Sequence, residues 1–399
     1  MRFAPDDLAF IADPYPTYAE LRESAPVLHD EHTDHWLVSR HGDVNRLLRD
    51  RRFGRTYLHA ATHEDMGRPP DPARLMPFWN LIRSGILDME PPDHLRVRSL
   101  VSKAFTPRFV DSLRPRIQRI CDRLVDRVGG SGEFDLLPEI AEPLPVAVIA
   151  EMLGIPEADR HHLRPWSADI CKMYELHPDA DAERDAVRAS IGFSDYLRSL
   201  SRDRRSRPQD DLVSALTEAV VDGERLSEDE LIGTCVLLLN AGHEATVNVT
   251  VNGWWSLFRN PGQLAMLRAD PSLMATAVEE LMRYDTPLQM FERWVLEAFE
   301  LHGVQVPKGA ELGLLFGSAN RDPAVFDRPD ELDIARDPNP HMSFGAGIHF
   351  CLGAPLARIE LQTSFTTLLT RFPRMELVEE PAWKPAYIIR GLTGLLVRV

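Results

Sequence analysis

The residues with the clearest chemical potential lie near the C-terminal end, where Cys351 stands among three glycines in the ten residues 344–353. Glycines at this density let the backbone take positive φ values and pass close to a flat partner. A helix-forming apolar run begins directly afterwards, at about Ala354. A thiolate at a helix N-terminus is stabilised by the exposed backbone N–H groups and by the positive end of the helix dipole. The stretch therefore predicts a deprotonated sulfur ligand for a metal.

The full pattern Phe-Gly-x-Gly-x-His-x-Cys-x-Gly is present, with Phe344, Gly345, His349, Cys351 and Gly353 at its fixed positions. An arbitrary cysteine in a glycine-rich loop is more often a small buried side chain, but so many fixed positions rarely match by chance. The stretch resembles the haem-binding loop of the cytochrome P-450 family, and more closely that of its soluble bacterial members that hydroxylate macrolides and polyketides. The resemblance implies haem b as cofactor, with Cys351 as the axial ligand whose electron donation favours O–O cleavage. It also implies that His349 contacts a haem propionate.

A long buried helix is predicted over residues 228–259, because Ser227 and Glu230 form a capping box and its centre is apolar all round. Gly242 and Glu244 lie inside this centre. A glycine in a helix costs about 1 kcal/mol relative to alanine, and a buried carboxylate costs several kcal/mol unless it is partnered. Both together indicate a site, although a packing glycine beside a satisfied polar group is the alternative.

The segment from Ala241 to Thr246 resembles the family's oxygen-activation motif, Ala/Gly-Gly-x-Asp/Glu-Thr. Matching by position places Glu244 on the acid and Ala245 where threonine is usual, and in the family that alcohol orders water and relays protons. Thr246 is about 100° further around the helix, so we do not expect it to point to the same place. Two accounts stay open for these catalytic positions. A substrate hydroxyl with ordered water replaces the alcohol, or the reaction needs less proton delivery, as in oxidative phenol coupling.

His94 and Arg98 are four residues apart and so share one face of a predicted helix that begins near Asp93. Two cationic donors on one face suit a pair of carboxylates, although such residues most often form a solvated basic face. The family's His-x-x-x-Arg pattern favours contact with the haem propionates. The resemblance implies a further propionate contact at Arg293.

Basic residues continue along the chain after this helix, in a protein whose net charge is −16: Lys103, Arg108, Arg114, Arg116 and Arg119. In the family this region lies on the cysteine side of the haem, where the electron donor docks. The resemblance therefore implies a basic docking surface for an acidic ferredoxin-type donor. No flavin or iron–sulfur domain is recognised in the sequence, so a separate reductase is expected to supply that donor with electrons.

Glu280 and Arg283 are three residues apart, which places them on one helix face. Such pairs are abundant on exposed helices and say little alone. Here they resemble the family's Glu-x-x-Arg motif, which implies a buried structural ion pair with Arg336 as a third member. Its role would be folding and haem retention.

The substrate pocket is indicated only through the resemblance. Residues 57–86 are rich in proline and predict an irregular loop, and the corresponding family loop covers the pocket. The candidate pocket residues are mostly apolar and fit a polyketide, macrolide, steroid or terpenoid equally well; they are Ile86, Leu87, Leu238, Ala241, Leu288, Gln289, Met290, Phe291, Ile388 and Ile389.

Composition excludes several classes of protein. The acidic balance argues against general nucleic-acid binding. The first residues lack the apolar run of a signal peptide, and no uncharged apolar stretch reaches membrane-spanning length, so no membrane association is expected. The four cysteines are scattered without a CxxC pair, which favours a reducing cytoplasm over a disulfide scaffold.

The resemblance covers nearly all of the 399 residues. It implies one mainly α domain over residues 1–399 with a small β region, and haem between the long central helix and the cysteine-loop helix. The expected protein is a monomeric haem-thiolate monooxygenase that inserts one oxygen atom from O2 into an apolar small molecule. A non-catalytic haem-binding sensor is the alternative from another class.

Overall fold

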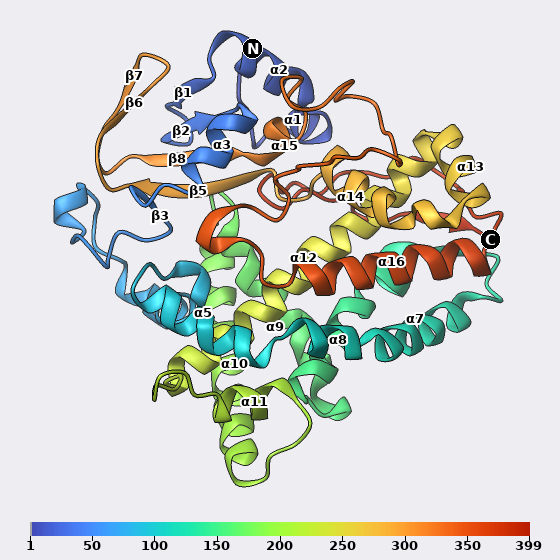
Figure 1. Cartoon of the computed structure of the whole chain (residues 1–399), viewed down its shortest axis with the longest axis horizontal. Coiled ribbons are helices and arrows are strands. Elements are labelled where there is room, and N and C mark those ends of the chain that lie inside the picture. Colours follow the sequence, from blue (N-terminus) through green and yellow to red (C-terminus); the bar gives the residue numbers. More distant parts are fainter. Residues whose placement is uncertain (1) are drawn as a thin grey trace. The chain divides into compact units, whose positions relative to one another are not determined.

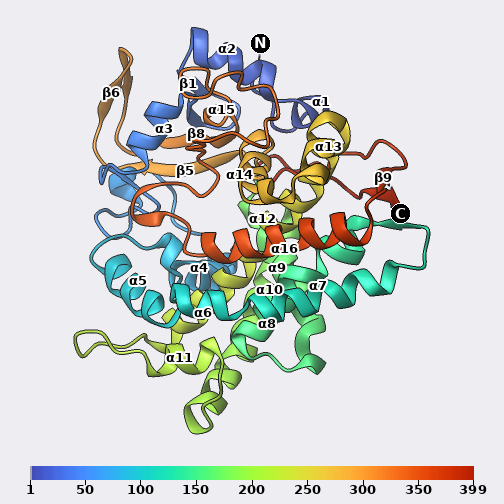
Figure 2. The same cartoon turned by 45° about the vertical axis from the view of Figure 1, so that its right-hand side comes forward.

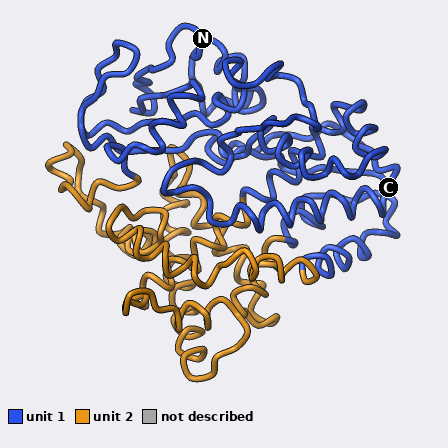
Figure 3. Tube along the Cα trace, in the orientation of Figure 1, with its two compact units in different colours: residues 1–54, 117–144, 245–399 blue, residues 55–116, 145–244 orange. Residues whose placement is uncertain are grey.

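The computed structural model describes residues 2–399, which form two compact units built from interleaved segments (Figure 3). Unit 1 contains residues 1–54, 117–144 and 245–399, and unit 2 contains residues 55–116 and 145–244. The long helix α12 (Glu228–Arg259) has the bounds that the sequence predicts, and it leaves unit 2 and enters unit 1 at residue 245. The expectation of a single domain stays a prediction.

The main sheet belongs to unit 1 and has the strand order β1-β2-β8-β5-β3. Only β2 and β8 pair in parallel; the other neighbours are antiparallel. Two apolar runs, 27–28 and 36–38, are split by the polar stretch 30–34 and so predict an N-terminal hairpin. The structure confirms it, with Val27 opposite Val38. The strands are β1 (Val27–Asp30), β2 (His35–Val38), β3 (Phe53–Gly54), β5 (Met290–Val295) and β8 (Glu311–Leu315).

One face of this sheet packs on an apolar cluster. Leu312 and Leu314 of β8 and Val295 of β5 point into it, together with Val44 of helix α3 (His41–Leu47). The smaller strands of unit 1 are β4 (Glu133–Asp135), β9 (Glu376–Leu377) and β10 (Leu396–Arg398) in one sheet and β6 (Phe299–Leu301) with β7 (Val304–Val306) in another.

Helices α14 (Met274–Tyr284) and α16 (Ala354–Arg371) contact each other in unit 1, and they lie side by side in Figures 1 and 2. The second half of α12 packs closely on α16. The ring centroids of Trp254 and Phe365 are 5.2 Å apart, and a Cβ at Gly253 would come within 2.9 Å of the Phe365 ring. The other α-helices that lie wholly in unit 1 are α1 (Leu8–Ala12), α2 (Tyr15–Ser24), α3, α13 (Pro261–Ala269) and α15 (Phe316–Ala319). Its short helices are η4 (Leu137–Ala141), η7 (Pro271–Leu273) and η8 (Gly347–His349).

Unit 2 is helical, and α10 contacts both α9 and α4. Helix α4 corrects the prediction of an irregular stretch over residues 57–86. Pro77 lies in its first turn, where proline is tolerated, and Phe78 and Leu81 bury its apolar face. The α-helices that lie wholly in unit 2 are α4 (Met76–Arg83), α5 (Asp93–Ala104), α6 (Pro107–Ser112), α9 (Leu163–Cys171), α10 (Ala180–Ser206) and α11 (Leu212–Glu218). Like α12, helices α7 (Arg114–Val128) and α8 (Pro143–Leu153) cross unit borders.

The predicted fold class, mainly α with a small β region, is confirmed. Among residues 2–399, no helix combines the length and the apolarity that crossing a bilayer requires.

Candidate functional site

The loop that precedes α16 is shaped by glycines with left-handed backbone angles. Gly345 has φ +66° and Gly347 has φ +71°. A Cβ at Gly347 would come within 2.3 Å of the Leu48 carbonyl oxygen, so only glycine fits there. The backbone N–H of Cys351 donates to the Phe344 carbonyl at 3.0 Å and closes the loop. The loop thus has one defined course, which sets Cys351 directly before the helix.

Cys351 differs from the other cysteines in its surroundings. Cys121, Cys171 and Cys235 are buried, and burial raises the pKa of Cys121 to about 11 and that of Cys235 to about 12. Burial also raises the pKa of Cys171 well above its ordinary value. Cys351 alone among the cysteines of residues 2–399 is partly exposed, and it precedes an 18-residue helix whose free N–H groups favour a thiolate.

A clamp that sequence reasoning missed ties the cysteine-loop helix to α14. Arg358 donates to both carboxylate oxygens of Glu279, at 2.6 and 2.7 Å, and His341 Nε2 lies 3.1 Å from the same carboxylate. Burial raises the pKa of Glu279, but hydrogen bonds from Arg358 and His341 outweigh it and bring this pKa to about 2. The Arg358 guanidinium also lies 4.6 Å from the Phe344 ring, so one side chain holds both ends of the loop.

Glu280 and Arg283 form a fully buried pair on α14. Arg283 donates to both carboxylate oxygens at 2.7 and 2.8 Å, and Arg336 Nε donates to the same carboxylate at 3.1 Å. Asn339 and the backbone N–H of Asp333 complete its hydrogen bonds, at 3.1 and 2.9 Å. With both oxygens saturated, the geometry is that of a structural ion pair.

Arg293 lies on β5, where it is 1% exposed. It is opposite Leu312 in the antiparallel ladder, so it shares the sheet face with the apolar cluster. Its Nη1 donates to the Glu292 carbonyl at 2.9 Å, and its guanidinium lies 4.7 Å from the Phe291 ring. The arginine is therefore held by its own strand.

The two predicted pocket segments of unit 1 lie side by side. Leu288 and Ile389 form an isolated antiparallel bridge, and the Gln289 N–H donates to the Ile388 carbonyl at 3.0 Å. Leu288 is partly exposed, whereas Met290 is 1% exposed. The structure thus joins residues that lie about 100 positions apart in the chain.

Gln289 is committed to the interior of unit 1. Its Oε1 accepts from the Tyr18 hydroxyl at 2.9 Å and its Nε2 donates to the Thr286 carbonyl at 2.6 Å. Tyr18 in turn shares a hydrogen bond with the Tyr387 hydroxyl at 2.8 Å. The role of Gln289 as a pocket residue stays a prediction. Its hydrogen bonds to Tyr18 and Thr286 position the segment around it.

In unit 2, His94 and Arg98 lie one turn apart on α5, with His94 1% exposed and Arg98 partly exposed. Arg96, on another face, forms an ion pair with Glu230 in the first turn of α12. The helix that carries the predicted propionate contacts is therefore anchored to the start of α12.

Ile86 and Leu87 begin the short helix η3 (Ile86–Asp88) of unit 2. Ile86 is buried and Leu87 is partly exposed. A Cβ at Gly233 on α12 would come within 2.4 Å of Ser84 Oγ and 2.8 Å of the Gly85 nitrogen. This close approach fixes the segment against the central helix.

An accessible stripe interrupts the buried centre of α12. Ala241 and Ala245 are exposed and Leu238 is partly exposed, at the spacing of a single helix face. Thr246 is only 5% exposed and lies off this stripe, as its 100° offset requires. The stripe therefore presents only small or apolar side chains.

The helix turn around this stripe is held from the other side. A Cβ at Gly242 would come within 2.6 Å of the Ile149 side chain of α8, so the two helices touch there. His243 is buried, and its Nδ1 lies 3.6 Å from Oε1 of Glu244, whose side chain is 20% exposed. The Glu244 side chain thus stays partly accessible, while the contact at Gly242 fixes the position of α12.

The candidate residues form two sets, each described within its own unit. Unit 1 holds those of the second half of α12, of β5 with the two residues before it, of the cysteine loop and of the last turn: Ala245, Thr246, Leu288, Gln289, Met290, Phe291, Arg293, Phe344, Gly345, His349, Cys351, Gly353, Ile388 and Ile389. Unit 2 holds Ile86, Leu87, His94, Arg98, Leu238, Ala241 and Glu244.

Comparison with known proteins places this arrangement in context. The sequence profile of the family described as Cytochrome P-450 matches residues 58–386. Cytochrome P-450 107B1 of Saccharopolyspora erythraea is 42% identical over 403 residues, which cover 98% of this chain and 96% of that relative.

Solved structures agree over the whole length. P450BioI in complex with an acyl carrier protein ligated to hexadec-9Z-enoic acid matches with a TM-score of 0.91 at 35% identity, covering 98% of this chain and 99% of that chain. The bacillaene polyketide synthase cytochrome PksS of Bacillus subtilis 168 matches with a TM-score of 0.90 at 36% identity, covering 99% of each chain.

Proposed function

The chain belongs to the cytochrome P-450 family, and from this premise we propose that it inserts one oxygen atom into an apolar small molecule of the polyketide or macrolide type. Membership makes it a haem b monooxygenase that uses O2 and takes electrons from a redox partner. The proposal concerns the residues that do this work, the substrate class and the donor.

The residues of the cysteine loop fit haem b. Cys351 is the one accessible cysteine among residues 2–399, and the glycine backbone before it leaves no Cβ at the places where the loop turns. Cys351 would supply the thiolate ligand, and His94, Arg98, Arg293 and His349 would hold the propionates. When bound, haem b supplies the redox chemistry that activates O2.

Positive groups of the chain lie where they would favour a thiolate at Cys351. The N-terminal N–H groups of α16 and the nearby Arg358 guanidinium, whose own pKa is raised by Glu279 and by Cys351, provide positive charge. The clamp of Arg358, Glu279 and His341 fixes the loop at both ends.

The observation that carries the substrate proposal is the stripe of Leu238, Ala241 and Ala245 on α12. It offers an apolar surface and no hydroxyl, since Thr246 is buried beside it. A substrate that brings its own hydroxyl supplies the missing proton-relaying group. Hydroxylated polyketides and macrolides combine an apolar frame with such groups, which favours them over substrates that carry no hydroxyl.

The test is an absorbance titration of the ferric haem-loaded protein with a matched panel. A hydroxylated macrolide, its deoxy analogue, a steroid and a free fatty acid are compared. In the titration we expect a low- to high-spin shift with the macrolide. In a separate turnover assay we expect the deoxy analogue to give little product per NADPH consumed. A shift with the steroid or fatty acid alone would contradict the proposed substrate class.

With the deoxy analogue, Ala245→Thr is expected to raise the product formed per NADPH consumed, because it returns an alcohol to the accessible stripe. Val247→Thr adds the same hydroxyl at a buried position and should leave this ratio unchanged. Product and NADPH are measured in the same steady-state assay. An equal ratio in Ala245→Thr and the wild type would mean that the alcohol missing at position 245 does not limit coupling.

We place the ferredoxin-type donor on the basic surface that includes Arg108 of α6. Arg114 and Arg116 are paired with Asp111 and Asp210 at 3.2 and 3.3 Å. Lys103 donates to the Val220 carbonyl. Arg108 is exposed and has no ion-pair partner within 4.0 Å among residues 2–399, so its charge is available to an acidic protein.

Arg108→Glu is expected to slow electron transfer from an acidic ferredoxin about 10-fold at low ionic strength, with the difference shrinking as salt is added. Arg184→Glu makes the same charge change at a side chain that is 71% exposed on α10, and it should leave the rate unchanged. The rate is followed by stopped-flow reduction of the haem. Equal rates for the two variants would exclude docking at Arg108.

A further inference from the structure

Three side chains of metal-ligating type lie together on the main sheet of unit 1, apart from the cysteine loop. They are His35 of β2, Glu311 of β8 and Glu292 of β5. His35 Nε2 is 3.8 Å from Glu292 Oε1 and 4.0 Å from Glu311 Oε2. One ligand atom from each residue lies within 4.8 Å of the other two.

The strand register itself places these side chains on one face. His35 is the parallel partner of Glu311, and Trp294 is the antiparallel partner of Glu311. Glu292 lies two residues from Trp294 and so points to the same side. This face is opposite to the one that carries Leu312 and Arg293.

The ring of His35 is oriented by the hairpin turn. Its Nδ1 lies 2.6 Å from the Thr33 carbonyl oxygen, which only accepts, so Nδ1 carries a proton. Thr33 is fixed in turn, because its N–H and hydroxyl donate to Asp30 at 2.9 and 2.8 Å. A metal-binding histidine is commonly held in this way, with the second nitrogen left for the ion.

The remaining nitrogen of His35 faces the two carboxylates. The residue is 7% exposed, and its Nε2 has no hydrogen-bond partner within 3.5 Å among residues 2–399. Glu292 and Glu311 keep 31% and 19% of their side-chain surface exposed, so an ion has a path from solvent. A buried nitrogen thus meets two accessible carboxylates across three strands.

We propose that His35, Glu292 and Glu311 bind a divalent transition-metal cation such as Zn²⁺, which joins β2, β8 and β5. Imidazole and carboxylate are both donors that zinc accepts, and three protein ligands leave a fourth position for water. Bonds of about 2.0–2.2 Å place ligand atoms about 3.4 Å apart in a tetrahedral site. The carboxylates therefore move inward by about half an ångström on binding.

The function of this site is structural. The ion would tie the N-terminal hairpin to strands that lie more than 250 residues later in the chain. Without a metal, the same three residues would form an imidazolium–carboxylate cluster, so the experiment must separate a bound ion from an ion pair.

The haem-loaded chain is treated with a chelator, dialysed against buffered ZnCl2 and analysed for bound zinc, with its melting followed at the haem absorbance. We expect saturable zinc uptake with a rise in Tm, since an ion that binds only the folded state stabilises it. Glu311→Gln should weaken the uptake at least about 10-fold. Glu292→Gln, which changes a more exposed side chain, repeats the test if Glu311→Gln does not fold.

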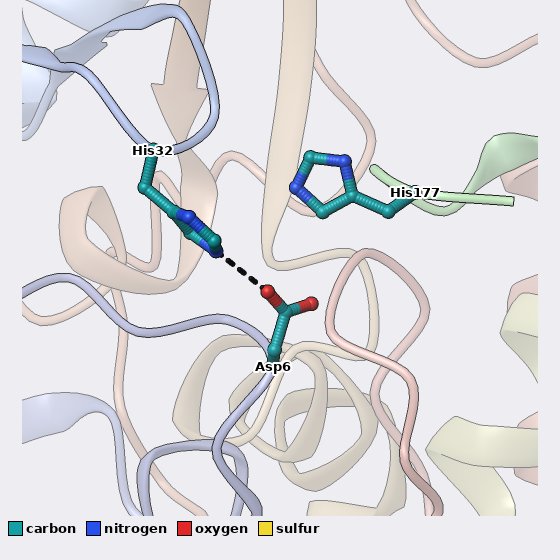
Figure 4. A group of neighbouring side chains, drawn as sticks. All are labelled: Asp6, His32 and His177. Atoms are coloured by element: carbon teal, nitrogen blue, oxygen red, sulfur yellow. Dashed lines mark hydrogen bonds and ion pairs between the residues drawn. The ribbon is translucent and has the colours of Figure 1, made fainter.

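The matched control is another imidazole–carboxylate pair of unit 1, the exposed Asp6 and His32, whose Oδ2 and Nε2 lie 2.7 Å apart (Figure 4; His177, also drawn there, belongs to unit 2). His32→Gln should leave zinc uptake and the Tm rise unchanged. Uptake that is equal in the wild type and in both glutamate variants would overturn the proposal. Uptake lost in His32→Gln alone, or absent from the wild type, would also overturn it.

Discussion

Cys351→Ser is expected to lower monooxygenase activity more than about 100-fold, since even the loss of an outer partner of a metal ligand costs about 10–100-fold. The change replaces the partly exposed thiol in front of α16 by a hydroxyl that does not ionise near neutral pH. The absorption spectrum of the ferrous carbon monoxide complex reports the axial ligand directly. We expect it to lose its thiolate character while circular dichroism still shows a helical protein.

Cys121→Ser is the control for Cys351→Ser. Cys121 is buried on α7 with a pKa that burial raises to about 11, so its thiol stays protonated. This variant should keep the thiolate spectrum and lose only some stability. A thiolate spectrum retained in Cys351→Ser would remove Cys351 as the ligand.

Glu280→Gln is expected to lower the free energy of unfolding by about 3–5 kcal/mol, the cost of breaking a buried ion pair by removing one partner. The carboxylate accepts from Arg283, Arg336, Asn339 and a backbone N–H while being fully buried. The amide carries no charge and offers one acceptor oxygen, so two guanidinium groups lose their counter-ion. Urea unfolding, followed by circular dichroism and by haem absorbance, measures the change.

Asp195→Asn is the matched control for Glu280→Gln. Asp195 and Arg198 also form a pair three residues apart on a helix, at 3.1 Å, but the Asp195 side chain is 70% exposed. Solvent screening reduces such a pair to about 0.5 kcal/mol or less. Equal losses of stability in the two variants would show that burial of the Glu280 pair adds nothing.

Features encoded locally were predictable from the sequence. Ser227 and Glu230 exchange the two hydrogen bonds of a capping box, at 2.8 and 3.2 Å, and α12 begins where these residues indicate. The hairpin of β1 and β2 also followed from its own apolar pattern and polar turn. Helix α4 was missed because Pro77 was interpreted as a breaker, although a first-turn proline has no hydrogen bond to lose.

Features that depend on long-range pairing were not predictable. Glu279 and Arg358 are 79 residues apart, and no motif around Glu279 indicates this partner before α14 is placed against α16. His35, Glu292 and Glu311 meet only through the register of three strands. The motif around Cys351 indicated a metal ligand because it resembles that of a known family. The clamp of Arg358, Glu279 and His341 is evident only in the folded chain.

The interleaving of the two units has a consequence for synthesis of the protein. Strand β2 pairs with β8, where His35 is the partner of Glu311. The ribosome adds 276 residues after His35 before it reaches Glu311. At roughly 5–20 residues per second this takes about 14–55 s. During that time the hairpin has an unpaired edge, which is open to pairing with other chains. Newly made chains are therefore expected to depend on chaperones until β8 has left the ribosome and paired with β2.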